Sequence, residues 1–204
     1  MNDSNDQTVA GYNKTVSKYI DTSPQKVDGD LKNWIDKNLS KLDQSAKILE
    51  IGSGSGKDAD YFTSRGYALE LTDASRGFVD HLNKTGRNAR LLNAITDDLG
   101  FGYDMVFADA VFLHFNRVQL KDVLEKVYEA LKPSARIAFS LKAGRGEEIT
   151  ERKLDVPRYF CFWEAEDIQK LLTSIGFKDV DIVVIDDYRG KDRPDWLLID
   201  AVRP

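Results

Sequence analysis

Three glycines and two acids stand at spacings that would let a small ligand approach the backbone. The run Glu50-Ile51-Gly52-Ser53-Gly54-Ser55-Gly56 follows a short apolar stretch, and Asp73 lies further along the chain. Glycine permits tight turns and close backbone approach. A helix expected from Lys57 would point its first N–H groups at the same space, which suits a carboxylate or a phosphate. The pattern therefore predicts a ligand site at this loop.

The same residues favour a cationic ligand over a diphosphate. A dinucleotide fingerprint of the form G-x-G-x-x-G needs a glycine at position 57, and that residue is Lys57. Glu50 would repel a pyrophosphate and attract an ammonium or sulfonium group, while a carboxylate at Asp73 can accept both hydroxyls of a ribose. S-adenosylmethionine carries a ribose, a positive charge and a carboxylate. It fits the pattern better than NAD does, so a nicotinamide oxidoreductase is the weaker alternative.

The elements expected around this loop form an α/β fold. Short apolar runs predict strands, and amphipathic stretches between them predict helices. We expect a Rossmann-like, seven-stranded, mostly parallel sheet with helices on both faces. The last two strands should form an antiparallel hairpin, because the loop 187–195 is too short for a crossover helix. The strands are expected over 46–51, 67–72, 89–95, 103–108, 135–142, 180–186 and 196–202.

Composition narrows the class of protein. The chain has 204 residues, 42% hydrophobic and 31% charged, which is typical of a single globular domain. Its net charge of −5 argues against an electrostatic grip on nucleic acid. A lone Cys161 cannot form an internal disulfide, and neither a signal peptide nor a membrane span is evident. We expect a cytoplasmic protein, away from membranes, that is a monomer or a homodimer.

The chain resembles class I S-adenosylmethionine-dependent methyltransferases over about residues 10–204. The segments ILEIGSGSGKDADYF, LELTDASRGF and YDMVFADAVFLHF match the motifs after the first, second and fourth strands. The resemblance is greatest to small bacterial methyltransferases of the tellurite-resistance-like or unknown-substrate type. It implies a methyltransferase domain over 46–204 behind an N-terminal helical cap or lid over 1–45. It also implies S-adenosyl-L-methionine as donor and S-adenosyl-L-homocysteine as product.

The resemblance also assigns cofactor contacts to residues of this sequence. The glycine loop would surround the methionine part, Asp73 would bind the ribose, and residues after the third strand would rim the adenine. Asp109 would lie near the methyl-donor end. Tyr19 would belong to a lid, although ordinary packing of its helix is an equal interpretation. The cofactor-binding residues expected are Glu50, Gly52, Ser53, Gly54, Gly56, Asp73, Ala74, Ser75, Asn93, Ala94, Ile95, Asp109 and Tyr19.

Three residues are candidates for chemistry. His114 follows the fourth strand at the ligand-binding edge and could act as a general base, or it could be a structural histidine in a turn. Lys142 and Arg145 follow the fifth strand, where with Arg158 they would select an anionic acceptor. A solvated charged loop is the alternative interpretation. No Cys/His cluster has metal-ligand spacing, so no metal is expected.

The predicted function is methyl transfer from S-adenosylmethionine to a small-molecule acceptor that carries negative charge. The alternatives are an RNA or protein methyltransferase, which the acidic charge disfavours, and a non-catalytic subunit that binds S-adenosylmethionine. The aromatic residues of the run RYFCFW could wall an acceptor pocket or pack in the core.

Overall fold

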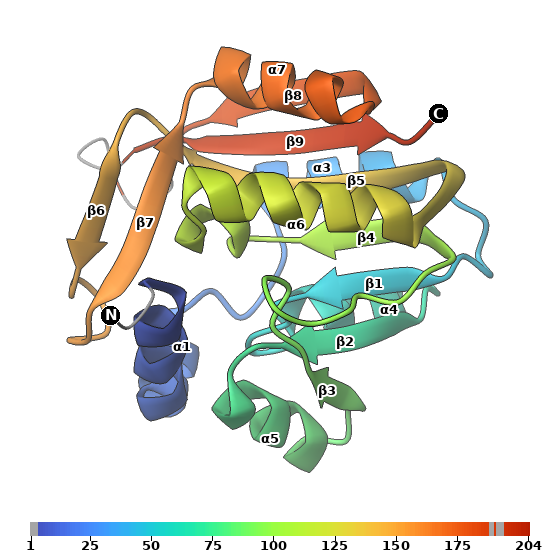
Figure 1. The fold of residues 1–204 in the computed structure, drawn as a ribbon. Coiled ribbons are helices and arrows are strands. Elements are labelled where there is room, and N and C mark those ends of the chain that lie inside the picture. The colour runs from blue at the N-terminus through green and yellow to red at the C-terminus, as the bar shows by residue number, and fades with distance from the viewer. Residues whose placement is uncertain (1–3, 188–189, 191–193) are drawn as a thin grey trace.

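One sheet of nine strands organises the molecule (Figure 1). The computed structural model describes residues 4–187, 190 and 194–204. The main strand order is β3-β2-β1-β4-β5-β7-β6, and β9 pairs with both β5 and β8. The strands are β1 (Ile48–Ile51), β2 (Leu69–Asp73), β3 (Ala89–Leu91), β4 (Tyr103–Ala108), β5 (Leu131–Ala143), β6 (Glu147–Thr150), β7 (Arg158–Trp163), β8 (Lys178–Ile185) and β9 (Trp196–Val202).

Seven α-helices and one short 3-10 helix surround this sheet in the described residues. Figure 1 shows α6 in front of the sheet, with α3 and α4 behind it. The helices are α1 (Ser4–Lys14), α2 (Val16–Thr22), α3 (Gly29–Leu39), α4 (Lys57–Ser64), α5 (Arg76–Lys84), η1 (Phe112–His114), α6 (Arg117–Ala130) and α7 (Ala165–Ile175).

The strand β1 lies at the centre of the parallel region, between β2 and β4. All four of its residues are buried, as expected for a strand with helices on both faces. The chain runs from β1 to β2 on one side, whereas β4 and β5 lie on the other. Open α/β sheets bind ligands outside the carboxyl ends of the strands where the order reverses in this way. The topology therefore directs attention to the residues after β1 and β4.

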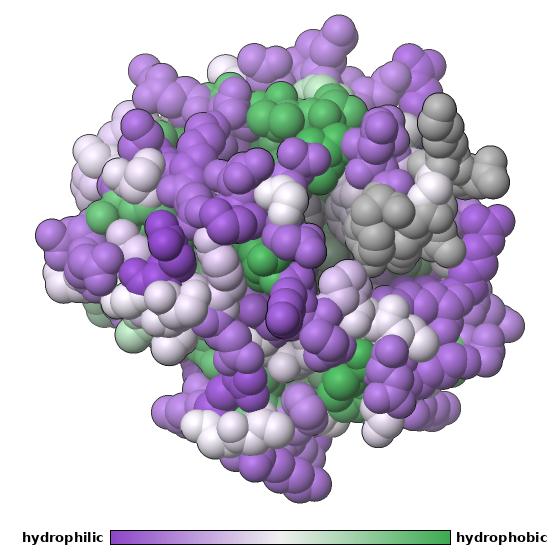
Figure 2. Space-filling model, turned by 180° about the vertical axis from the view of Figure 1, so that it is seen from behind, coloured by the Kyte–Doolittle hydropathy of each residue, from purple (hydrophilic) through white to green (hydrophobic). Residues whose placement is uncertain are grey.

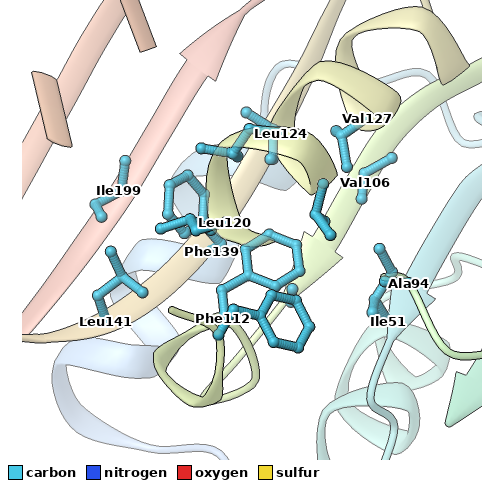
Figure 3. Close-up of a cluster of buried hydrophobic side chains, with 14 of the residues drawn as sticks. Ile51, Ala94, Val106, Phe112, Leu120, Leu124, Val127, Phe139, Leu141 and Ile199 are labelled. Atoms are coloured by element: carbon cyan, nitrogen blue, oxygen red, sulfur yellow. The ribbon is translucent and has the colours of Figure 1, made fainter. Parts of the chain in front are cut away.

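Successive side chains of β4 enter two different hydrophobic cores, one on each face of the sheet. Val106 joins the core under α6, whereas its neighbour Phe107 packs with Trp34 and Phe62 of α3 and α4. The core under α6 includes Phe112 of η1, whose ring centroid lies 5.4 Å from that of Phe139. Figure 3 shows Phe112 among the buried side chains of this cluster. The turn after β4 is thereby anchored in the larger core.

The face that carries α3 and α4 is mainly hydrophilic outside (Figure 2). The apolar residues Trp34, Ile35 and Leu39 of α3 are at most 4% exposed, because the helix turns them toward the sheet. An amphipathic helix that buries one stripe leaves polar residues on the surface. Thus α3 is a layer of the core, although it belongs to the first 45 residues.

Local signals explain where two helices begin. The Ser75 hydroxyl accepts a hydrogen bond from the Phe78 N–H and caps α5, because serine is a preferred residue at this position before a helix. At the start of α6, Asn116 and Gln119 form a reciprocal capping box. These caps fix the helices that follow β2 and η1, and they hold the loops beside the carboxyl ends of the strands.

The expected α/β fold and the antiparallel final pair are confirmed, since β8 pairs antiparallel with β9. All seven expected strands are present, and two more occur between β5 and α7. The run RYFCFW forms β7, which pairs antiparallel with β6 and parallel with β5 through Phe162 and Trp163. An aromatic-rich run of six residues is typical of a strand. The polar segment before it concealed β6 in the sequence.

Candidate functional site

The glycine loop between β1 and α4 leaves its face open to a ligand. Gly52, Gly54 and Gly56 have φ of +75°, +53° and +85°, a region that disfavours other residues. A Cβ atom on Gly52 would lie 2.3 Å from Cγ2 of Val111, so this position must be glycine for packing as well. A Cβ on Gly54 would meet nothing closer than the Tyr19 ring at 3.9 Å. The loop at Gly54 therefore borders free space.

Asp73 ends β2 and is held against this loop. Its Oδ2 accepts a hydrogen bond from the Gly54 N–H at 2.9 Å, and its Oδ1 accepts one from the Ser75 N–H at 2.8 Å. The residue is 8% exposed. Burial raises the pKa of the Asp73 carboxyl to about 6, although the two backbone N–H groups oppose that shift. The carboxylate is thus fixed in orientation before any ligand arrives.

A cavity of about 90 Å³, here called the glycine-loop cavity, lies between this loop and the first two helices. Its wall comes from the ends of β1, β2 and β4, from the segment after β3, and from α1 and α2. It includes nine of the expected cofactor residues: Tyr19, Gly52, Gly54, Asp73, Ala74, Ser75, Asn93, Ala94 and Asp109.

The other four expected cofactor residues do not line the cavity. Glu50 and Ser53 are buried, at 2% and 5% exposed. Gly56 caps α4 and faces the side chains of Leu82 and Arg87, and Ile95 packs against the larger core. For these four positions the cofactor role remains a prediction.

Glu50 holds one of its carboxyl oxygens, Oε2, in a buried position. Its Oε2 has no hydrogen-bond partner within the part of the chain that the structure describes. Burial raises the pKa of Glu50 to about 8, and the nearby Asp58 carboxylate adds to the shift. An unpartnered buried carboxylate is costly, and a cation placed against it would remove that cost. The atom is therefore suited to a positively charged ligand.

Lys57, the first residue of α4, lies among acids of three segments. Its Nζ is 2.6 Å from Oδ1 of Asp58 and 3.6 Å from Oδ2 of Asp109, which follows β4. Burial disfavours the Lys57 ammonium, but the carboxylates outweigh it and raise the lysine pKa. Sequence reasoning noted Lys57 only as a missing glycine. A cation directly after a glycine loop, with an acid beside it, was the available signal.

A second cavity of about 640 Å³, here called the outer cavity, adjoins the first. It is lined by segments from both ends of the chain, including the start of α3, the end of β5, β6, β7 and the start of β9. Five residues line both cavities and mark where they meet: Tyr12, Tyr19, Asp109, Ala110 and His114. A group in one cavity can therefore face a group in the other across these residues.

His114 lies at that junction with both ring nitrogens engaged. Its Nδ1 is 2.6 Å from the Tyr159 carbonyl oxygen, and its Nε2 is 2.8 Å from the Tyr12 hydroxyl. A carbonyl only accepts, so Nδ1 carries the hydrogen and Nε2 accepts from Tyr12. Burial lowers the pKa of His114 to about 3, and the nearby Arg158 charge also lowers it. The imidazole is thus neutral and its lone pair is already used.

Of the two candidates, Lys142 lies within β5 and lines the outer cavity, whereas Arg145 follows β5 and does not line it. Its Nζ is 2.5 Å from Oδ2 of Asp187, and it lies 3.8 Å from the centroid of the Trp196 ring. Arg145 instead projects outward, with its side chain 82% exposed and paired with Glu164 at 2.8 Å. The cations of the final loop, Arg189, Lys191 and Arg193, could also face an acceptor, but they lie outside the described residues.

Aromatic rings from α1, α2 and α5 close one side of the glycine-loop cavity. The Tyr19 ring centroid lies 5.7 Å from that of Tyr12 and 5.2 Å from that of Phe78, both edge-on. The sequence predicted Tyr19 as part of a lid but gave no sign of Phe78 or of the contact of Asn5 and Thr8 with the cavity. Phe78 faces the core side of an amphipathic helix, so its pattern indicated packing alone.

The described ranges contain neither a membrane-spanning helix nor a metal-ligating cluster. No helix there combines the length and the apolar character that crossing a membrane requires. No group of three or more His, Cys, Asp or Glu side chains in those ranges could hold a metal ion.

Comparison with known families places the chain. A family described as methyltransferase domain matches residues 25–182, which is more than half of the chain, so the protein belongs to that family. A probable S-adenosyl-L-methionine-dependent methyltransferase TehB from Haemophilus influenzae is 24% identical over 98 residues. The match covers 45% of this chain and 34% of that protein. The chain thus spans about a third of the length of the curated relatives that it matches.

Solved methyltransferase structures share the fold at low identity. The 1,6-didemethyltoxoflavin-N1-methyltransferase of Burkholderia thailandensis is 18% identical with a TM-score of 0.70, covering 95% of this chain and 87% of that one. It was solved with its substrate and S-adenosylhomocysteine. Phosphoethanolamine N-methyltransferase 2 of Haemonchus contortus, with S-adenosyl-L-methionine, is 14% identical with a TM-score of 0.71. That match covers 99% of this chain and 57% of that one. At such identity the likeness supports the fold alone.

Proposed function

We propose that the protein transfers a methyl group from S-adenosyl-L-methionine to a small-molecule acceptor. The observation that carries this proposal is the meeting of two cavities at Tyr12, Tyr19, Asp109, Ala110 and His114. The donor would occupy the glycine-loop cavity and the acceptor the outer cavity. The family and the structures of its relatives support the reaction class.

The residues around the glycine-loop cavity fit this donor. Asp73, oriented by two backbone N–H groups, would accept the ribose hydroxyls. Ala74 and Asn93 would flank the adenine. The Oε2 of Glu50, unpartnered among the described residues, suits the cationic methionine end and offers a pyrophosphate no counter-charge. These features favour S-adenosylmethionine over a nicotinamide dinucleotide.

The protein's part in the reaction is to orient two molecules and exclude water. The bound donor supplies an already activated methyl group, so in-line approach of the acceptor is the main requirement. Tyr12 and Tyr19 would close the junction on one side, and Asp109 and Ala110 on the other. His114 could take a proton from an acceptor only through the Tyr12 hydroxyl, because Tyr12 already donates to its free nitrogen.

The N-terminal helices have different roles in this proposal. Within residues 1–45, α1 and α2 line both cavities through Tyr12 and Tyr19. By contrast, α3 packs against the sheet, and only its first residues reach the outer cavity. We assign the cap or lid to α1 and α2. Because their rings cover the glycine-loop cavity, these helices would have to move to admit a nucleoside.

A small acceptor is favoured over RNA or protein. The outer cavity of about 640 Å³ lies in the range typical of small-molecule pockets, roughly 300–1,000 Å³. The net charge of −5 would oppose a polyanion at long range. A cavity bounded by α3, β5, β7 and β9 encloses a compact molecule better than a chain segment.

Calorimetry of the full chain tests the proposal. We expect heats of binding with S-adenosylmethionine and S-adenosylhomocysteine and none with NADH. Asp73→Ala should weaken both by about tenfold or more, since it removes hydrogen bonds made by a charged group. Asp80→Ala, on the outer part of α5, is the matched control and should bind as the wild type does. Binding of NADH but of neither methyl-donor nucleoside would refute the proposal.

A further inference from the structure

Arg158, the first residue of β7, is a buried cation in the wall of the outer cavity. It is 6% exposed. One of its terminal nitrogens, Nη2, donates to the Arg152 carbonyl oxygen, and the other, Nη1, is 3.4 Å from the Tyr12 hydroxyl oxygen. Its Nε has no hydrogen-bond partner among the residues that the structure describes. Every partner of this guanidinium in the described ranges is therefore a neutral oxygen.

A buried guanidinium without a counter-charge is expensive. Taking the charge out of water costs free energy that a neutral carbonyl and a distant hydroxyl only partly return. The contrast with Lys142 is direct, because Lys142 lines the same cavity and is paired with the buried Asp187 carboxylate. Of these two buried cations, Arg158 is the one for which no ion pair occurs in the described part of the chain. The described part of the chain thus provides no negative charge beside the Arg158 guanidinium.

The hydrogen-bonding geometry of the Arg158 guanidinium indicates which ligand would neutralise its charge. A planar guanidinium donates two parallel hydrogen bonds to a carboxylate or a phosphate, and Nε is one of the donors used for this. The Tyr12 hydroxyl gives its hydrogen to His114, so it offers Arg158 a lone pair and offers an anion nothing. The Phe160 ring, with its centroid 5.2 Å from the guanidinium carbon, limits hydration on one side. An oxyanion bonded to Nε would satisfy the site.

We propose that the acceptor bears a carboxylate or a phosphate and that Arg158 binds this oxyanion. The inference rests on the proposed function and specifies its substrate class. Because Arg158 is hydrogen-bonded to Tyr12, a residue of the junction, an anion held there lies beside the point of methyl transfer. Arg158 would therefore set the orientation of the acceptor as well as select it.

The test uses the full chain saturated with S-adenosylhomocysteine. The Nε–Hε resonance of Arg158 is followed by NMR during titration with inorganic phosphate, with acetate and with tetramethylammonium. We expect saturable shifts with phosphate, acetate or both, and none with the cation. Which anion saturates at lower concentration identifies the preferred group. Absence of a shift with both anions would overturn the proposal without recourse to any variant.

Variants then assign the effect to the guanidinium. Arg158→Gln should weaken anion binding by about tenfold or more, and Arg158→Lys should weaken it less because the charge remains. Arg65→Gln, which removes an exposed cation paired with Asp36, is the matched control for net charge and should bind as the wild type does. Equal weakening in Arg65→Gln would also overturn the proposal.

Failure of the inference is distinguishable from failure of the proposed function. If S-adenosylhomocysteine binds and neither anion does, the methyl donor stands and only the acceptor class is wrong. If S-adenosylhomocysteine itself gives no heat, the proposed function fails first. Calorimetry on the same samples separates these two results.

Discussion

The hydroxyl of Tyr12 in α1 lies 2.8 Å from Nε2 of His114, 102 residues further along the chain. The other ring nitrogen of His114 is bonded to the Tyr159 carbonyl in β7. The His114 imidazole thus connects α1, the turn after β4 and β7 at the junction of the two cavities. A structural role explains its burial, and the Tyr12 hydroxyl is the route by which it could also act on a substrate.

Tyr12→Phe should destabilise the protein. The variant leaves Nε2 of His114 buried without a donor, which costs about 1–3 kcal/mol of unfolding free energy. Urea unfolding at neutral pH measures the change. Tyr61→Phe is the control, since the Tyr61 hydroxyl donates to Asp36 near the surface and its loss should cost less than about 1 kcal/mol. Equal losses in the two variants would contradict a special role for the Tyr12 contact.

His114 should remain neutral in the folded protein far below its usual range. Burial lowers its pKa from 6.5 to about 3, so between these pH values the unfolded chain binds a proton that the folded chain does not. Stability contributed by His114 is therefore full above pH 6.5 and falls as the pH drops toward 3, by up to about 1.4 kcal/mol per pH unit.

Two measurements check this expectation. The His114 ring proton should show no titration by NMR between pH 7 and pH 5. In urea unfolding over the same range, His114→Phe should lose stability less steeply with falling pH than the wild type does. An imidazole that titrates near pH 6 in the folded state would show that the site is wetter than its burial indicates.

Binding of S-adenosylmethionine should release a proton from Glu50. Because pH 7 is below the Glu50 pKa of about 8, this carboxyl holds a proton in the free protein. A cation against Oε2 would lower that pKa and expel the proton. Calorimetry at pH 7 in buffers of different ionisation enthalpy detects the release, and Glu50→Gln should abolish it. Unchanged proton release in that variant would place the titrating group elsewhere.

Glu50→Gln should also stabilise the free protein at high pH, while it weakens the binding of S-adenosylmethionine. A carboxyl with a raised folded pKa contributes stability that is present below pH 4.5 and lost as the pH rises through about 8. The glutamine variant lacks this loss, so its stability relative to the wild type should increase from pH 5 to pH 9. Urea unfolding at the two pH values, with S-adenosylmethionine calorimetry beside it, separates the effect on stability from that on binding.

The sequence predicted the half of the site that local patterns encode. The glycine loop, Asp73 and the Ser75 cap follow from residue types at short spacing between a strand and a helix, and the structure brings them together. The antiparallel pairing of the two C-terminal strands followed from the shortness of the loop between them. In each case the signal and the contact lie in one stretch of chain.

Contacts between distant segments were beyond the sequence. Lys57 after β1 contacts Asp109 after β4, at the edge where the strand order reverses. Arg158 contacts Tyr12 because β7 packs beside α1. The pairing of β7 with β5 involves only two register positions, which is too short to give a recognisable sequence pattern. Arg145, by contrast, had a promising neighbourhood in sequence but lies 82% exposed in its side chain, because the segment after β5 turns it outward.

Gly52→Ala should show how closely the turn after β4 packs on the loop. Its added Cβ would lie 2.3 Å from Cγ2 of Val111 at φ +75°, so strain and overlap together should cost about 2 kcal/mol or more. Gly86→Ala has φ +85° and open space around the new atom, so it isolates the cost of the backbone conformation, about 1 kcal/mol. Adding Val111→Ala to Gly52→Ala should recover the difference between the two in urea unfolding. If the double variant is no more stable than Gly52→Ala, the loop rather than Val111 moves to make room for the added methyl. The affinity for S-adenosylhomocysteine should then fall in the double variant as far as in Gly52→Ala alone.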